Sequence, residues 1–467
     1  MPAPAPTATP ASAPTAPPEL TAEQASATMR SRPFLVLLVL VAIVGIGVSL
    51  AAWCFLELVH QIQQEVFTHL PHAVGYPNGP PVWWPLPVLA IAGVITAFAI
   101  RRLPGNGGHI PAQGLATGGP PPTGHQLPGI LLAAIATIGL GIVLGPEAPL
   151  IALGSGLGAI AIRAARRDAP VQVVTIVAAA GSFAAVSFVF SSPLIAAVIL
   201  IEAAGIGGAR LPLLLVPGLL AAGVGSLVSL GMGSFTGLST SAYALSALPL
   251  PKFGHPNVAE FGWTIALALA VAAVGSVVMR GGLATHRIAA PRAMIVLPLI
   301  GLVIAGLGIA FSQTTGHSVN EVLFSGQDQL PGLVSHAATY SLGALALLLV
   351  CKGVAYALSL GSFRGGPTFP AIYLGVAGGI AASHLPGFPL TAATAVGMTA
   401  GVAAILRLPL TAVVVGTVLT ASSGAGSEPL IIVAAVIAYV MTLLLSAPRP
   451  AAATPAPRPA SPAAAPS

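Results

Sequence analysis

Glu147 is the residue in this sequence best suited to do chemistry. It is the third residue of Gly-Pro-Glu-Ala-Pro at positions 145–149, inside apolar sequence. Of the 11 acidic residues, only Glu147 and Glu202 are embedded in this way. An ionisable side chain within a membrane is costly and marks a functional site by default. We predict that the ionised Glu147 side chain takes the place of a bound anion. Because desolvation favours the protonated form, a proton can neutralise the carboxylate and release it from that place, which would make Glu147 a gate.

A second loop resembles the one that carries Glu147. Residues 145–154 read GPEAPLIALG and residues 366–375 read GPTFPAIYLG, with six of ten positions identical. A second matched pair, around Pro193 and Pro409, follows in the same order. Glycine and proline that interrupt hydrophobic segments at corresponding positions of two halves indicate the substrate site of a duplicated transporter. The alternative is that these residues only kink helices for packing, since both are common in membrane spans.

Short helices are predicted to follow these prolines. The runs Leu150–Ile162, Ala371–Ala382 and Leu410–Ala421 are about 12 residues each, as expected of half-helices that begin inside a membrane. The first N–H groups of a helix lack intrahelical partners, and the helix dipole places partial positive charge there. Each such end therefore attracts an anion.

Composition indicates the surroundings of these helices. Of the 467 residues, 55% are hydrophobic and 6% charged, with a mean hydropathy of +0.94, which excludes an ordinary soluble protein. Long apolar runs begin near Phe34, Trp83, Leu127, Val171, Leu211, Gly262, Ala293, Tyr340 and Pro429. The net charge of +6 comes from scattered basic residues rather than a basic and aromatic patch, so no nucleic-acid partner is expected. The sequence predicts an all-α membrane protein in the lipid bilayer.

The distribution of basic residues predicts the orientation. Arginines cluster at 30–32, 101–102, 163–167 and 280–292, whereas connectors 59–82 and 312–339 contain no lysine or arginine. The positive-inside rule then places both termini in the cytoplasm of a multi-pass protein of the cell membrane. We expect a disordered tail rich in proline and alanine at 1–33, a first membrane repeat at 34–235, an extracytoplasmic linker at 236–257, a second repeat at 258–446 and a second disordered tail at 447–467.

The motifs resemble those of the CLC family of chloride channels and proton-coupled chloride antiporters. The segment 145–149 is similar to the family's G-x-E-x-P motif, whose glutamate is the gate. Residues 107–111 resemble a diverged G-S-G-I-P loop, and residues 365–370 resemble the G-x-F-x-P loop. The resemblance covers roughly 34–446. It implies an inverted-topology repeat with broken and half-helices, and an anion pathway in each subunit of a homodimer.

The anion-binding residues that the resemblance implies depart from the family pattern. The family's anion-contacting serine aligns with Gly108, or with Asn106 if two residues are inserted, so its hydroxyl is missing. His109 is then either a neutral packing residue, an anion-facing donor or an interfacial residue. In the later loop the candidate residues are Gly366, Thr368 and Phe369, with Arg364 just before them.

Pro367 lies where the family supplies a backbone N–H to the anion, and proline has none. Arg364 is a candidate replacement donor, with a structural partner for helix carbonyls as the alternative. The family's central tyrosine has no counterpart, because Tyr439 lies inside an apolar run and is expected to pack there.

The proton pathway of the family's antiporters is also incomplete. Their internal proton glutamate aligns with Ala203, next to Glu202. One residue rotates a helical side chain by about 100 degrees, so Glu202 is a relay candidate whose alternative is a structural carboxylate at a neighbouring helix end.

We therefore expect chloride or a similar small anion to be conducted through each protomer and gated by Glu147. The alternative is a proton-coupled chloride or fluoride antiporter, in which protons are a second partner. An intramembrane enzyme is a remote alternative, because no H-E-x-x-H zinc motif occurs. Neither a cofactor nor a metal is expected.

Overall fold

The computed structural model describes residues 21–115, 119–205, 207–238, 245 and 247–446. These residues form helices and connecting segments without a named strand, so the predicted all-α fold class is confirmed. The first part of the chain contains α1 (Ala22–Met29), α2 (Arg32–Gln64), α3 (Leu70–Ala73), α4 (Pro85–Arg102), α5 (Leu127–Gly139), α6 (Glu147–Ala165), α7 (Val171–Phe190), α8 (Pro193–Ala204) and α9 (Leu211–Thr236). The rest contains α10 (Val258–Ala289), α11 (Ala293–Thr315), α12 (Leu330–Ser335), α13 (Leu342–Ser362), α14 (Thr368–Ala382), α15 (Leu390–Leu406), α16 (Pro409–Leu419) and α17 (Glu428–Ser446).

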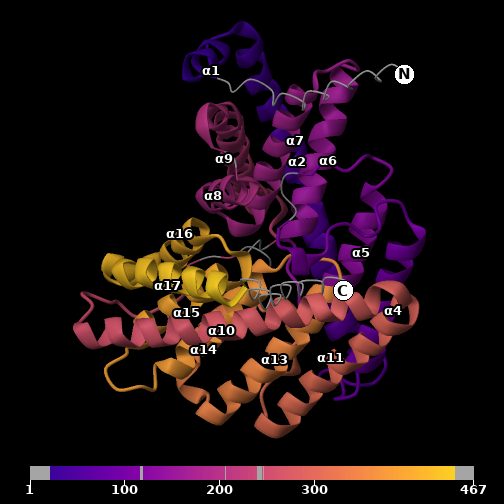
Figure 1. The fold of residues 1–467 in the computed structure, drawn as a ribbon. Helices are drawn as coiled ribbons and strands as arrows, with labels where there is room; N and C mark the ends of the chain where they lie inside the picture. Colours follow the sequence, from indigo (N-terminus) through magenta and orange to yellow (C-terminus); the bar gives the residue numbers. More distant parts are fainter. Residues whose placement is uncertain (1–20, 116–118, 206, 239–244, 246, 447–467) are drawn as a thin grey trace, which may run out of the picture.

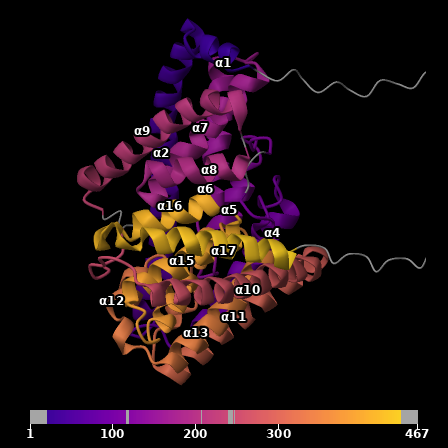
Figure 2. The same cartoon turned by 60° about the vertical axis from the view of Figure 1, so that its left-hand side comes forward.

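Eight stretches of the described chain are long and apolar enough to cross a membrane, as an integral membrane protein requires. Figure 2 places the end of α17 and the corner between α10 and α11 on the right of the molecule. In the same view α12 and the end of α9 lie on the left, and α17 lies beside α10, against which it packs.

Two expectations need correction. Residues 22–33 are not disordered: Thr21 and Gln24 form a capping box at the start of α1, and α2 begins at Arg32 behind the cap Ser31. The rest of that tail and the tail at 447–467 lie outside the described residues. The second correction is that α6 is no half-helix of 12 residues. It has 19 residues and begins at Glu147, because a proline such as Pro149 is tolerated in the first turn.

The same packing arrangement occurs twice along the chain. Helix α6 packs on α7, and α14 packs on α15. At the first crossing a Cβ atom on Gly154 would overlap the carbonyl of Gly181, and at the second a Cβ atom on Gly375 would overlap that of Gly397. Only glycine permits such close backbone contact. These pairs are offset by the same 221 and 216 positions as the two sequence motifs, which supports the predicted duplication.

Contacts between the two parts interlock them (Figure 1). Helix α4 packs along α11, and α8 packs on α16. The glycines Gly93 and Gly301 sit against the backbone of the opposite helix at the first of these contacts. The loops before α6 and α14 consequently meet in the interior.

Candidate anion site

The loops before α6 and α14 pair through their backbones. Gly145 donates its N–H to the carbonyl of Gly366 at 2.8 Å, and Gly366 donates to the carbonyl of Gly145 at 2.6 Å. Each helix then begins behind a proline cap, Pro146 or Pro367. The amino ends of α6 and α14 therefore meet at one place, which is where two positive helix ends can act on the same anion.

The Glu147 carboxylate lies between these two helix ends. Glu147 is the first residue of α6 and is 1% exposed. Its Oε1 accepts a hydrogen bond from the backbone N–H of Thr368, the first residue of α14. Its Oε2 has no partner among the described residues. The carboxylate belongs to the first repeat but lies at the amino end of α14 in the second repeat, where the free N–H groups of a helix attract an anion.

Residues beside Glu147 shape the site. Thr368 is fully buried, and its Oγ1 is unpartnered in the described structure. The ring of Phe369 stacks on Phe190 with centroids 5.1 Å apart and forms an apolar wall. Tyr356, from α13, donates its hydroxyl to the carbonyl of Pro367 and so holds the cap of α14. Sequence reasoning missed Tyr356, because a tyrosine in an apolar run looks like any packing residue.

Arg364 lies three residues before Pro367 and is 7% exposed. Its Nη1 donates to the carbonyl of Phe363 at 3.0 Å, and its backbone N–H donates to Thr137 Oγ1 at 3.3 Å. Its Nε has no partner, and neither of the ion pairs within the described chain includes it. A buried guanidinium keeps its charge, so Arg364 offers hydrogen-bond donors to an anion.

The other predicted anion-binding residues, Asn106, Gly108 and His109, lie in the loop before the short 3₁₀ turn Pro111–Gln113 and line two different cavities. Gly108 and His109 line a cavity of about 800 Å³ together with Arg364, whereas Asn106 lines a second cavity whose lining also includes Arg364. The four consecutive residues before His109 have positive φ angles, which suits Gly105, Gly107 and Gly108 and is tolerated by Asn106.

His109 is tied to its own loop. Its Nε2 lies 2.9 Å from the carbonyl of Gly114, a contact that requires Nε2 to carry the proton. Burial lowers the pKa of His109 below its ordinary value of 6.5, and the charge of Arg364 lowers it further against the opposing effect of the Gly114 hydrogen bond. A neutral ring is therefore favoured at this position.

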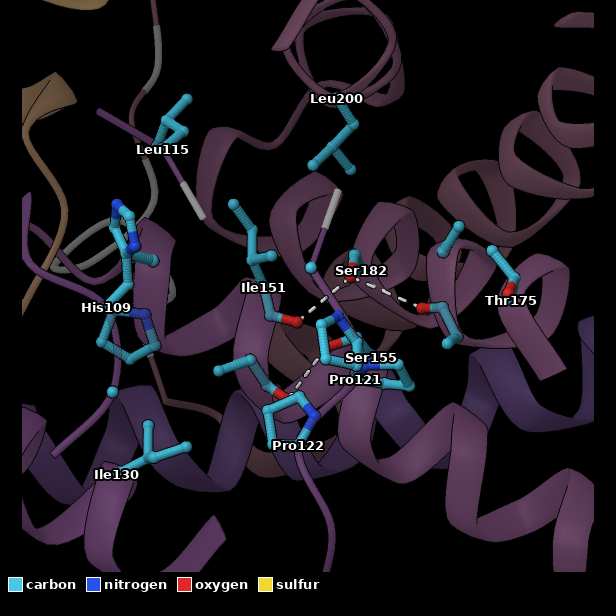
Figure 3. A pocket seen from close by; sticks show the side chains of 18 of the residues that line it. His109, Leu115, Pro121, Pro122, Ile130, Ile151, Ser155, Thr175, Ser182 and Leu200 are labelled. Carbon is cyan, nitrogen blue, oxygen red and sulfur yellow. Dashed lines mark hydrogen bonds between the residues drawn. The ribbon is translucent and has the colours of Figure 1, made fainter. Parts of the chain in front are cut away.

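Figure 3 shows the larger cavity, which we call the first cavity. The hydroxyl of Ser155 donates to the carbonyl of Ala152 in its own helix, and the hydroxyl of Ser182 bonds to the carbonyls of Ile151 in α6 and Ala178 in α7. The side chains of Ile130, Ile151 and Leu200 supply apolar walls. Arg163 and Arg364 also line it, and none of its described lining residues is acidic. The cavity is therefore electropositive.

Glu202 lies near the end of α8, and its carboxylate contacts the start of α16. Its Oε1 accepts from the N–H of Leu410 at 2.9 Å and its Oε2 from that of Thr411 at 2.7 Å. At the start of α8 the cap is Ser192, but the corresponding residue before α16 is Leu408, which has no side-chain acceptor. Glu202 supplies the missing cap from the other repeat.

Lys352 is a second buried cation that sequence reasoning missed. It lies within α13 and is 0% exposed. Its Nζ donates to four consecutive carbonyls of residues 321–324, at 2.8 to 3.4 Å, and lies 4.2 Å from the ring centroid of Tyr373. Phe324 in turn donates its N–H to Gly141, in the loop that leads to Glu147. The sequence feature that could have identified Lys352 is its position as a single lysine within an apolar run.

Comparisons with known proteins agree on one family. The family model described as voltage gated chloride channel matches residues 112–443. A candidate ion-transport protein, YfeO, of Shigella sonnei strain Ss046 is 30% identical over 370 residues, covering 77% of this chain and 82% of that protein. YfeO of Escherichia coli strain K12 / DH10B is also 30% identical, over 374 residues, with the same coverage.

Two solved structures share the fold. The chain aligns with a slow cyanobacterial Cl⁻/H⁺ antiporter at a TM-score of 0.71 and 19% identity, over 88% of this chain and 95% of that one. It aligns with a CLC-type fluoride/proton antiporter at a TM-score of 0.64 and 18% identity, over 88% and 96%. With the family match and the paired helix ends around Glu147, these similarities establish that the chain belongs to the CLC family of voltage-gated chloride channels, a family of anion transport.

Proposed function

We propose that this protein conducts chloride or a similarly small anion through a pathway in each protomer, and that Glu147 gates it. The observation that carries the proposal is the carboxylate of Glu147 on the N–H of Thr368. A transported anion would compete for the same N–H. Protonation removes the negative charge that holds the carboxylate there, so a proton opens the site to the anion.

The electrostatics of the surrounding cavities support anion transport. Arg364 is buried without a carboxylate partner among the described residues, and the first cavity is lined by Arg163 and Arg364 but by no acidic residue. Because unpaired buried charge is costly, Arg364 favours an anion in the pathway, and the exposed Arg163 adds positive charge to the cavity lining. Pro367 supplies no N–H, so Arg364 and Thr368 are the proposed donors at this end.

We further propose that proton coupling is weak or absent. Ala203 cannot carry a proton at the position where antiporters of the family place a glutamate. Both oxygens of Glu202 are engaged in capping α16, which favours a structural role. The alternative is a proton-coupled chloride or fluoride antiporter, which the descriptions of the two similar structures keep as the competing hypothesis.

A gating experiment tests the first proposal. Glu147→Gln keeps the size of the side chain but removes its charge, so anion efflux from reconstituted vesicles should persist and lose most of its pH dependence. At neutral pH the variant should match the acidic wild-type rate within about twofold, since it resembles the protonated gate. If Glu147→Gln kept the pH profile of the wild type, Glu147 would not be the gate.

A chloride gradient across sealed vesicles tests the second. Downhill chloride flux without proton movement is expected, and Glu202→Gln should lower the thermal midpoint rather than alter coupling, because a capping interaction is worth about 1 kcal/mol. Stoichiometric uphill proton movement that disappears in Glu202→Gln would instead make Glu202 a relay. Substituting Ser192 by Ala, which removes the corresponding cap of α8, is the matched control.

We place the protein in the cell membrane as a homodimer with both termini in the cytoplasm. The arginine clusters support this orientation, since Arg101 and Arg102 end α4 and Arg292 lies at the corner between α10 and α11. The dimer is proposed from membership of the family.

A further inference from the structure

Arg364 lines a second cavity besides the first. Its volume is about 360 Å³, and it lies between the end of α4, the end of α13 and the corner between α10 and α11. Its polar lining residues are Arg101, Asn106, His286, Ser362 and Arg364. Among the described residues, Arg364 is the one that the linings of the two cavities share.

Two buried polar groups of this lining lack partners. Ser362 is 2% exposed and Arg364 is 7% exposed, and within the described residues Ser362 Oγ and Arg364 Nε make no hydrogen bond. A buried donor without a partner costs about 1–3 kcal/mol, and more when it is charged. Two unsatisfied groups beside one cavity indicate that something in the cavity satisfies them.

The charge of the lining selects the kind of ligand. Arg101 and Arg364 are cationic, and no acidic side chain is among the described residues that form the cavity. His286 places its Nδ1 3.0 Å from the carbonyl of Gly361, so this nitrogen carries the ring proton. Water alone would satisfy Ser362 but would leave the guanidinium charge uncompensated.

We propose that the second cavity is an anion-binding chamber that holds a small inorganic anion between Ser362 Oγ and Arg364. Arg101, which is exposed at the rim, draws the anion in. The inference rests on the proposed anion transport and extends it: the pathway branches at Arg364, and each branch brings the transported class of anion to the same guanidinium.

A matched pair of arginines tests the role of the rim. Arg101 and Arg102 are adjacent, both are exposed at the end of α4, and only Arg101 lines the chamber. At low ionic strength Arg101→Gln should slow chloride efflux several-fold more than Arg102→Gln, and added impermeant salt should remove the difference by screening. Equal effects of the two substitutions would contradict the steering role.

Bromide provides the direct test of the chamber. Crystals of the full chain soaked in bromide should show anomalous density against Ser362 and Arg364, and Ser362→Ala should abolish this density and raise the chloride concentration for half-maximal flux by about tenfold, the loss expected for one hydrogen bond to a charged group. Ser362→Thr, which retains the hydroxyl, should restore both. If Ser362 were only structural, Ser362→Ala would lower the stability of the protein but would bind bromide and chloride as Ser362→Thr does, which would contradict the proposal.

The two levels of the hypothesis fail differently. Gated anion flux with bromide confined to the first cavity would overturn the chamber and leave the proposed function intact. Absence of anion flux in the wild type and in every variant would overturn both.

Discussion

At the scale of single residues, the Glu147 carboxylate fills a space that two glycines leave open. A Cβ atom added at Gly145 would overlap Oε2 of Glu147, and one added at Gly366 would overlap its Cδ and Cγ. Neither glycine is needed for a positive φ angle, since neither has one. Their lack of a side chain therefore serves the carboxylate rather than the backbone.

This close fit predicts that a methyl group at position 366 displaces the Glu147 side chain in the same way as its protonation does. Gly366→Ala should displace the Glu147 side chain from the amino end of α14, so that anion flux loses its pH dependence as in Glu147→Gln. Gly353→Ala is the matched control, because Gly353 lies in the neighbouring α13 with no atom within 4 Å of an added Cβ. Vesicle efflux over a pH series makes the comparison; a wild-type profile in Gly366→Ala would show that the carboxylate has another resting place.

At the scale of elements, Lys352 of α13 holds the segment 321–324, which contacts the loop before Glu147. Lys352 donates to the carbonyls of residues 321–324, and Phe324 both bonds to Gly141 and packs its ring edge-on against Phe67 at 5.0 Å. One ammonium group thus donates hydrogen bonds to all four carbonyls of this turn. The segment reaches the loop before Glu147 through this chain of contacts.

Lys352→Met should loosen that segment. Removing hydrogen bonds to a charged donor is expected to cost on the order of 3 kcal/mol, seen as a lower thermal midpoint and faster amide exchange in residues 321–324. Lys252→Met is the control, since Lys252 is exposed and donates to the single carbonyl of Ser422. Equal loss of stability in the two variants would show that the cluster of carbonyls around Lys352 has no special weight.

Elements were more predictable than the contacts between them. The apolar runs predicted from Leu127, Val171, Leu211 and Ala293 coincide with the starts of α5, α7, α9 and α11, because a span must reach a minimum apolar length. The repeated motif also indicated that both loops belong to one site. It could not indicate that Glu147 bonds to the helix of the other repeat, since such a contact depends on how the repeats pack.

The capping of α16 was beyond prediction for the same reason. Leu408 shows that α16 lacks a cap of its own, and Glu202 shows that a carboxylate lies in an apolar run, but 208 positions separate the acceptor from Leu410. Helix-capping and burial rules applied to the sequence identify the missing cap at Leu408 and the buried carboxylate of Glu202 separately, without linking them. Only the contact of α8 with α16 brings them together.

At the scale of the whole molecule, the first cavity reaches the place where the two repeats meet. The antiparallel bridge between Gly145 and Gly366 is a single pair of backbones, and the first cavity reaches the adjoining residues Ala148, Pro149 and Gly365. Water that fills such a cavity conducts far better than protein does, so an applied potential falls mainly over the short part that excludes water.

We therefore expect a large part of the membrane potential to fall across the region of the bridge. A unit charge that crosses the full field changes in free energy by about 2.3 kcal/mol per 100 mV, which is a factor of up to roughly fifty in the equilibrium between Glu147 and an anion at the amino end of α14. Anion currents in planar bilayers should consequently depend on voltage, and Glu147→Gln should flatten that dependence. The protein would in this way sense the membrane potential with one carboxylate and the anion that replaces it.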